Sequence, residues 1–291
     1  MPPHFPPRPK KERIRTSIWH EVPSDENPFL PERVYCHGYA FDELIDRFDW
    51  VQLLFLHLTG ELPTQKESRC LNLIMAAIMN PGPRDAAVRA GMNCGIGKTP
   101  VTTILTTGLT VRGGMAEGGL HVEAAMRFLL GKLPEKNYPG NGDEKAGSMI
   151  HAYEEMKRDE TSEVFAPWPD SPPGFGLYYG SKDVRATMLA TKIVELEFAG
   201  KYLELARSIE GILSRDRDVH LTLPGVFAAV CCDLGLSPEH GSGLYAIAGS
   251  VGILAHGVEQ LSRNWNEYPF WADPKYYIYE NNGPNTELVK E

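Results

Sequence analysis

Apolar residues recur at helical spacing along most of the chain, and this recurrence is the main indicator of its structure. The pattern predicts helices over residues 41–48, 50–58, 64–78, 85–94, 100–111, 120–131, 184–213, 224–234 and 242–263. The pattern over 184–213 is interrupted near Gly200. No alternation of apolar and polar residues is long enough to predict a strand. We therefore assign the chain to the all-α class.

Breaker and capping residues set the ends of several of these helices. Gly60 and Pro63 follow the apolar run over 50–58 and stop it, and Thr64 can cap the next helix. Pro224 suits a first helical position, where its missing N–H group costs no hydrogen bond. The Pro- and Gly-rich stretches 135–145 and 161–181 predict domain boundaries or site loops.

Composition narrows the classes of function. The 291 residues include 38 acidic and 29 basic side chains, a formal net charge of -9, which argues against broad binding to nucleic acid. No run approaches about 18 apolar residues, so no membrane span is expected. The N-terminus is proline-rich and basic without an apolar core, which is not a secretory signal, so we expect a cytoplasmic location. The five cysteines have no metal-ligand spacing, and we expect reduced thiols and no bound metal.

Residues 95–99, Gly-Ile-Gly-Lys-Thr, have the composition of a phosphate-binding loop. The Walker A pattern, however, needs a glycine where this chain has Met92, and no predicted strand precedes the segment. We therefore interpret residues 95–99 as a tight connection between two core helices.

A second glycine-rich segment, residues 113–121, leads into a predicted helix. Glycines let the backbone approach a ligand closely, and a helix N-terminus favours an anion. Glu117 and His121 are candidates for a general acid and base. A plain helix connection, with an acid near a helix N-terminus, explains the same residues, and both interpretations stay open.

A third glycine-rich segment, residues 173–186, carries Lys182 and Arg185 at the start of a long predicted helix. Its backbone N–H groups and two cations could bind phosphates or an adenine edge, and a capped helix with solvated cations is the structural alternative. His220 is a plausible titrating group, although a lone histidine is more often a surface or capping residue. His256 and Glu259 share one helix face, where a core histidine is the favoured interpretation.

In their order along the chain, these segments resemble citrate synthases. The similarity covers Gly38–Leu44, Trp50–Leu58, Thr59–Thr64, the loop Gly113–Gly119, the segment Gly174–Ala186, the helix Pro224–Leu236 and the helix Leu254–Glu259. It extends over about residues 30 to 280. The first three segments form one amino-terminal motif, and the shared order and spacing of this motif and the four that follow indicate the fold.

The resemblance implies a two-domain helical fold with the site in the cleft between the domains. We expect an N-terminal arm over residues 1–29, a large domain of residues 30–125 and 240–291, and a small domain of residues 126–239. The resemblance also implies a homodimer that binds coenzyme A or an acyl-CoA together with a small keto or carboxylic acid. It assigns the backbone of Gly174, Phe175 and Gly176 to adenine and Arg185 to the coenzyme A phosphates, with Lys182 as a second cation.

The sequence departs from citrate synthases at the catalytic positions. The histidine expected in the glycine loop aligns with Glu117, and the histidine expected after Gly176 is Leu177. The expected aspartate falls on Pro224, and the expected carboxylate-binding arginine is Tyr268. Leucine and proline cannot carry a proton, so the usual mechanism does not transfer.

Two hypotheses follow. The first is an enzyme similar to citryl-CoA lyase, which makes or cleaves a carbon–carbon bond in an acyl-CoA with Glu117 or His220 as base and with His121 or backbone amides to stabilise a carbonyl. The tyrosine in place of arginine indicates a substrate with fewer carboxylates than oxaloacetate. The second is a non-catalytic regulator that binds coenzyme A, or a partner subunit of a citrate synthase-like complex.

Overall fold

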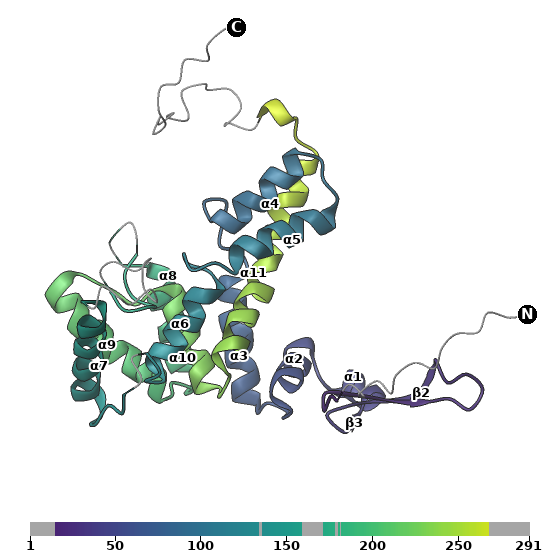
Figure 1. Cartoon of the computed structure of the whole chain (residues 1–291), viewed down its shortest axis with the longest axis horizontal. Coiled ribbons are helices and arrows are strands. Elements are labelled where there is room, and N and C mark those ends of the chain that lie inside the picture. The colour runs from purple at the N-terminus through teal and green to yellow at the C-terminus, as the bar shows by residue number, and fades with distance from the viewer. Residues whose placement is uncertain (1–14, 134–135, 159–170, 178–179, 181, 268–291) are drawn as a thin grey trace, which may run out of the picture. The chain divides into compact units, whose positions relative to one another are not determined.

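The computed structural model of the chain describes residues 15–133, 136–158, 171–177, 180 and 182–267. They fall into two compact units: residues 15–78 with 115–245, and residues 79–114 with 246–267. Helices make up most of the described residues, and the all-α prediction is confirmed. Figure 1 labels the elements along the chain.

The first unit begins with a small antiparallel sheet of three strands that the sequence analysis did not predict. Strands β1 (Trp19–Pro23), β2 (Pro31–Cys36) and β3 (Tyr39–Ala40) lie in the order β1-β2-β3. Most of their residues are exposed or half-exposed, so the sequence carries no alternation between a buried and a solvated face. The predicted arm of residues 1–29 therefore includes a strand, while residues 1–14 lie outside the described part.

Three helices follow the sheet where the apolar pattern predicted them. They are α1 (Phe41–Arg47), α2 (Trp50–Thr59) and α3 (Gln65–Ile78). Gly60 ends α2 in the left-handed conformation, with φ 80°. The Thr64 hydroxyl accepts a hydrogen bond from the Glu67 N–H group, and the Glu67 carboxylate accepts one from the Thr64 N–H group, as the predicted cap requires.

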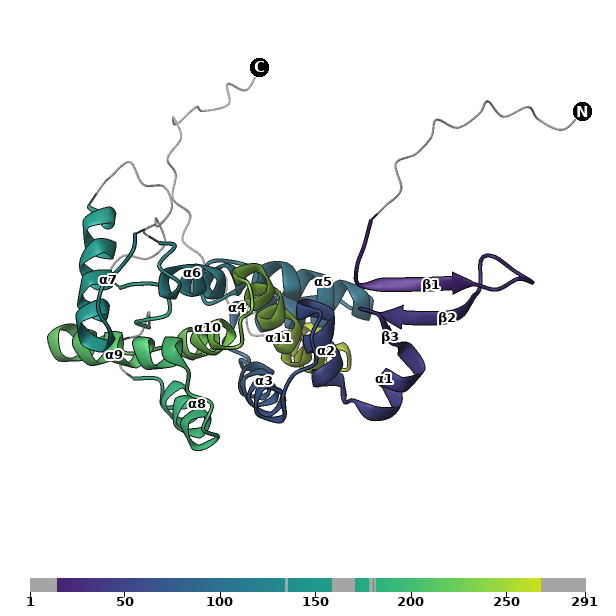
Figure 2. The ribbon, with the colours of Figure 1, turned by 90° about the horizontal axis from the view of Figure 1, so that it is seen from below.

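Four of the described helices of the first unit surround one central helix, α10 (Leu223–Asp233). Residues 223–232 of α10 are all buried, and the helix contacts α3, α6 (Gly119–Leu129), α8 (Val184–Glu195) and α9 (Lys201–Arg217). Figure 2 shows α10 beside α6 and α9. A helix that is apolar on every side is a core helix. Its buried position fixes the loop that precedes it, which carries His220.

Helix α7 (Gly142–Lys157) packs against α9 and was not predicted from the sequence. Its N-terminal half carries two glycines and three charged residues, which obscure the helical spacing of its buried apolar side chains.

The second unit contains α4 (Ala86–Ile96), α5 (Val101–Arg112), residues 246–261 of helix α11 (Pro238–Leu261) and a 3-10 turn, Trp265–Glu267. Glycines let these helices touch backbone to backbone: a Cβ atom on Gly95 would collide with the carbonyl oxygen of Gly257. The Lys98 ammonium donates to the carbonyl oxygens of Gln260 and Leu261 at the C-terminus of α11. The connection between α4 and α5 lies within residues 97–100, so the predicted connection at 95–99 begins two residues later than expected, and Lys98 caps a third helix.

Among the described helices, α11 alone is long and apolar enough to cross a membrane by length and composition. Within its most apolar 18-residue window, 44% is buried inside the structure, and the core helix of a water-soluble protein meets the same two criteria.

Candidate functional site

Three of the predicted segments meet at the N-terminal end of α10. We call this meeting point the histidine–glycine cluster and define it as His121, residues 174–176 and residues 220–222. His121 comes from the first turn of α6, and the other two segments are loops. All of these residues belong to the first unit.

His121 is buried, with 1% of its surface exposed, and it accepts a hydrogen bond at Nε2 from the Gly174 N–H group, 2.8 Å away. Burial lowers the pKa of His121 from 6.5 to about 3, because the charged imidazolium loses its hydration there. The ring is therefore neutral near pH 7. Because Nε2 accepts, the ring proton lies on Nδ1.

The loop of residues 174–176 is tied to the loop before α10 by a short antiparallel bridge. The Gly176 N–H group donates to the His220 carbonyl oxygen (2.8 Å), and the Thr222 N–H group donates to the Gly174 carbonyl oxygen (3.0 Å). Gly174 and Gly176 have φ values of 91° and 79°, in the left-handed region that favours glycine. A side chain on Gly225 would collide with the Gly174 carbonyl oxygen, so the two backbones can approach only because both residues are glycine.

Thr222 joins this loop to the central helix. Its hydroxyl donates to the Gly174 carbonyl oxygen (2.9 Å) and accepts from the Gly225 N–H group (3.1 Å), which caps α10. Pro224 occupies the first turn, as predicted. A threonine two residues before a proline is a recognisable cap signal, but the hydrogen bond from Thr222 to Gly174 spans 48 residues and has no local signal.

His220 lies between two carboxylates. Its Nδ1 is 3.4 Å from Glu210 Oε1, and its Nε2 is 3.1 Å from Asp218 Oδ1. Glu210 also accepts a hydrogen bond from the Leu221 N–H group (3.2 Å), so one carboxylate orients both the ring and the backbone beside it. Glu210 lies inside α9, and no motif in the sequence singled it out.

Arg185 and Glu117 form a second charged group in the same unit. The Arg185 guanidinium donates two hydrogen bonds to Asp183, from Nε (3.1 Å) and from a terminal nitrogen (2.9 Å), while Asp183 caps α8. The pKa of Arg185 is raised, first by its hydrogen bonds to Asp183, and also by the charges of Asp183, Glu117 and Tyr245. Glu117, with φ 55°, precedes α6 and lies near enough to act on Arg185 electrostatically.

Known structures share this fold. No protein-family model matches the sequence, and no curated protein matches it either. The structure is similar to citryl-CoA lyase from Hydrogenobacter thermophilus, with a TM-score of 0.73 and 23% identity over 95% of this chain and 98% of that one. The chain has the citrate synthase fold.

Two further structures support the assignment to the citrate synthase fold. ATP citrate lyase from Methanothrix soehngenii, solved in complex with citrate and coenzyme A, has a TM-score of 0.70 and 16% identity over 97% of this chain, which corresponds to 44% of that chain. Citrate synthase from Thermotoga maritima has a TM-score of 0.52 and 14% identity over 95% of both chains. The likeness therefore extends over almost the entire sequence.

Two of the positions at which this chain departs from the catalytic residues of citrate synthases lie at the glycine loop and at the start of α10. Leu177 is half-buried directly after the glycine loop, and Pro224 is buried in the first turn of α10. Tyr268 lies outside the described residues. No group of three or more His, Cys, Asp or Glu side chains suited to a metal occurs among the described residues.

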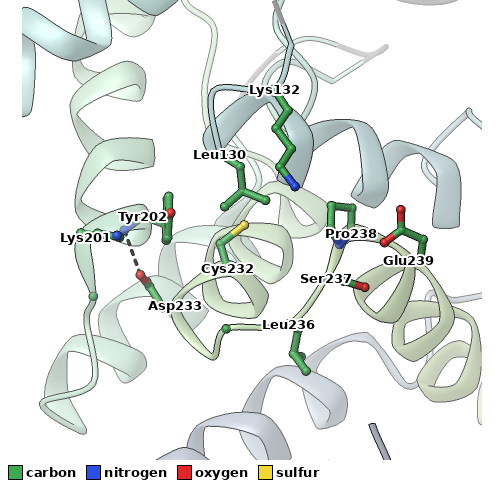
Figure 3. A pocket seen from close by; sticks show the side chains of 12 residues that line it. Leu130, Lys132, Lys201, Tyr202, Cys232, Asp233, Leu236, Ser237, Pro238 and Glu239 are labelled. Carbon is green, nitrogen blue, oxygen red and sulfur yellow. Dashed lines mark hydrogen bonds between the residues drawn. The ribbon is translucent and has the colours of Figure 1, made fainter. Parts of the chain in front are cut away.

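An open cavity of about 800 Å³ lies at the other end of α10 (Figure 3). Helix α10 has 11 residues and is about 16 Å long, so this cavity is separate from the histidine–glycine cluster. Asp233, the last residue of α10, faces this cavity. Its carboxylate accepts hydrogen bonds from the Tyr202 and Leu203 N–H groups and so caps the N-terminus of α9. Burial raises the pKa of Asp233, and none of the predicted site residues lines this cavity.

Proposed function

We propose that this chain is a citrate synthase-like enzyme that makes or cleaves a carbon–carbon bond in an acyl-CoA, in the manner of citryl-CoA lyase. The observation that carries the proposal is the likeness to citryl-CoA lyase, which covers 95% of this chain and 98% of that one. The meeting of His121, the glycine loop and His220 at one end of α10 supports it, because the resemblance to citrate synthases assigns the glycine loop to coenzyme A and the two histidines are the candidate acid–base residues beside it.

The proposed ligands are coenzyme A or an acyl-CoA and a small keto or carboxylic acid. The similar ATP citrate lyases were solved with citrate and coenzyme A and with citryl-CoA. In this chain, the backbone of residues 174–176 is the proposed surface for adenine, and Arg185 is the proposed contact for an anionic group. Arg185 has 59% of its side chain exposed, so a ligand can reach it.

The proposed chemistry is acid–base catalysis. In the cleavage direction, a base takes the proton of a hydroxyl group, the adjacent carbon–carbon bond breaks, and the hydroxyl carbon becomes a carbonyl. The bonding electrons move to the carbon beside the thioester, which then takes up a proton. His220, oriented by Glu210, and Glu117 are the proposed bases. His121 is the proposed carbonyl-stabilising group, because a neutral imidazole can still donate a hydrogen bond.

Turnover of acyl-CoA substrates tests this proposal. Purified protein is incubated with citryl-CoA and with a 3-hydroxyacyl-CoA that carries fewer carboxylates, and acetyl-CoA and the released carbonyl product are measured by mass spectrometry. We expect cleavage, with a rate at least about 100-fold lower in His220→Asn or Glu117→Gln. His151→Asn is the control, because His151 is 70% exposed on α7. Normal rates in both site variants would contradict the assigned roles.

A second candidate is a non-catalytic regulator that binds coenzyme A, or a partner subunit of a citrate synthase-like complex. One observation favours it: both ring nitrogens of His220 already face carboxylates within the protein. Binding of coenzyme A without turnover, together with co-purification of a citrate synthase-like protein that retains the usual histidines and aspartate, would support this candidate. A homodimer that cleaves citryl-CoA alone would contradict it.

We further propose that the protein is a homodimer, on the resemblance to citrate synthases, and that it acts in the cytoplasm, because its five cysteines are free thiols. Light scattering on the purified chain measures the oligomeric state. A monomer at micromolar concentration would contradict the first of these proposals.

A further inference from the structure

A small cavity of about 120 Å³ lies between α8 and α9, beside the histidine–glycine cluster. Six of the residues that line it matter here: Lys182, Thr187, Thr191, Arg207, Glu210 and Leu221. Glu210 and Leu221 connect it to the cluster, because the Leu221 N–H group donates to Glu210, which also faces His220. A ligand in this cavity would therefore lie beside Leu221, one of the two residues of the bridge between the two loops.

The charges around the cavity favour an anion. No ion pair involves Lys182 or Arg207 within the described residues, and both residues are exposed. The carboxylate of Glu210 is already engaged by the Leu221 N–H group and the His220 ring through the same oxygen, Oε1. Two cations from different segments thus border one cavity, and one oxygen of the acid beside them, Glu210 Oε1, is already hydrogen-bonded.

The size of the cavity limits the anion to a single group. A volume of 120 Å³ corresponds to about four water molecules at about 30 Å³ each, which suits one phosphate or carboxylate but not a nucleotide. A phosphate monoester carries a charge of about -1.5 to -2 near pH 7 and presents three strong acceptor oxygens, so it can engage both cations at once more fully than the two oxygens of one carboxylate can. The guanidinium of Arg207 can donate two parallel hydrogen bonds to such a group.

We propose that this cavity binds one phosphate monoester group through Arg207 and Lys182. The identification of its source rests on the proposed function: coenzyme A carries a single terminal phosphate monoester, on its ribose. A free phosphate or another phosphorylated small molecule offers the same chemistry, and the experiment separates these sources.

The first arm of the test uses inorganic phosphate. The melting temperature of the full chain is measured in phosphate and in chloride at equal ionic strength, for the wild type, Arg207→Gln and Lys182→Gln. Arg215→Gln is the matched control, because Arg215 lies on the same helix, is exposed and is absent from the cavity lining. A phosphate-dependent rise that both cavity variants lose and Arg215→Gln keeps is the expected result. No rise, or an equal loss in Arg215→Gln, would overturn the proposal.

The second arm compares coenzyme A with dephospho-coenzyme A by calorimetry. The wild type should bind coenzyme A about tenfold or more tightly than the dephospho form, and Arg207→Gln should bind the two equally. Phosphate stabilisation without any binding of coenzyme A would leave the phosphate site standing and contradict the proposed function. Equal affinity of the wild type for both ligands would exclude coenzyme A as the source of the phosphate group.

Discussion

Replacement of His121 by glutamine should reduce the loss of stability that the protein suffers on acidification. Burial lowers the pKa of His121 from 6.5 to about 3 in the folded chain, and unfolding restores the ordinary value. Between these values the unfolded chain binds a proton that the folded chain does not. The free energy of unfolding therefore falls as the pH decreases through this range. Above about pH 6.5 His121 is neutral in both states, and none of this stability is lost.

The magnitude follows from the difference between the two pKa values. From pH 7 to pH 5, His121 should lower the free energy of unfolding by about 2 kcal/mol, since each pH unit below the unfolded pKa is worth about 1.4 kcal/mol. Glutamine can still accept the hydrogen bond from the Gly174 N–H group but does not titrate.

Urea denaturation at pH 7 and pH 5 measures this effect. The change between the two pH values should be about 2 kcal/mol smaller in His121→Gln than in the wild type, while His151→Gln removes one exposed imidazole as a control. Carboxylates that titrate in the same range cancel in the comparison. An equal pH dependence in His121→Gln and the wild type would refute the argument that His121 is buried and neutral.

Two further predictions concern stability. Gly95→Ala places a methyl group against the Gly257 carbonyl oxygen and should destabilise the protein by about 1–3 kcal/mol in urea denaturation, whereas Gly147→Ala, in open space on α7, should be neutral or stabilise it by up to about 1 kcal/mol. Equal effects would contradict the close packing of α4 and α11. The Arg112 guanidinium lies 3.2 Å from the carboxylate of Asp85, whose side chain is only 14% exposed. Arg112→Met leaves this carboxylate without its ion-pair partner and should lower the free energy of unfolding by about 3 kcal/mol; a loss below about 1 kcal/mol would show that the pair contributes little.

The helices could be predicted because their signals are local. Apolar spacing and caps such as Thr64 and Pro224 act within a few residues, so the sequence alone places most helices within a few residues of their observed ends. The strands of residues 19–40 were missed because both of their faces are largely exposed. Helix α7 was missed because Gly142 and Gly147 weaken its pattern.

The candidate site could be predicted only in part, since its residues come from distant segments. The glycine loop at 174–176, His121 and His220 are visible as motifs, but their union depends on hydrogen bonds such as that from the Gly174 N–H group to His121. Glu210 and Arg207 carry no local signal, because a single charged residue on an exposed helix face is ordinary. Their importance arises from the packing of α9 beside α8 and the loop before α10.

Binding of coenzyme A is the most direct test of the account, because the proposed enzyme and the proposed coenzyme A-binding regulator both require it. The purified chain is titrated with coenzyme A and acetyl-CoA by calorimetry, beside Arg185→Gln and the control Arg215→Gln. We predict saturable binding that is about tenfold or more weaker in Arg185→Gln and unchanged in the control. The absence of binding of either ligand to folded wild-type protein would contradict the central claim that this citrate synthase fold acts on coenzyme A thioesters.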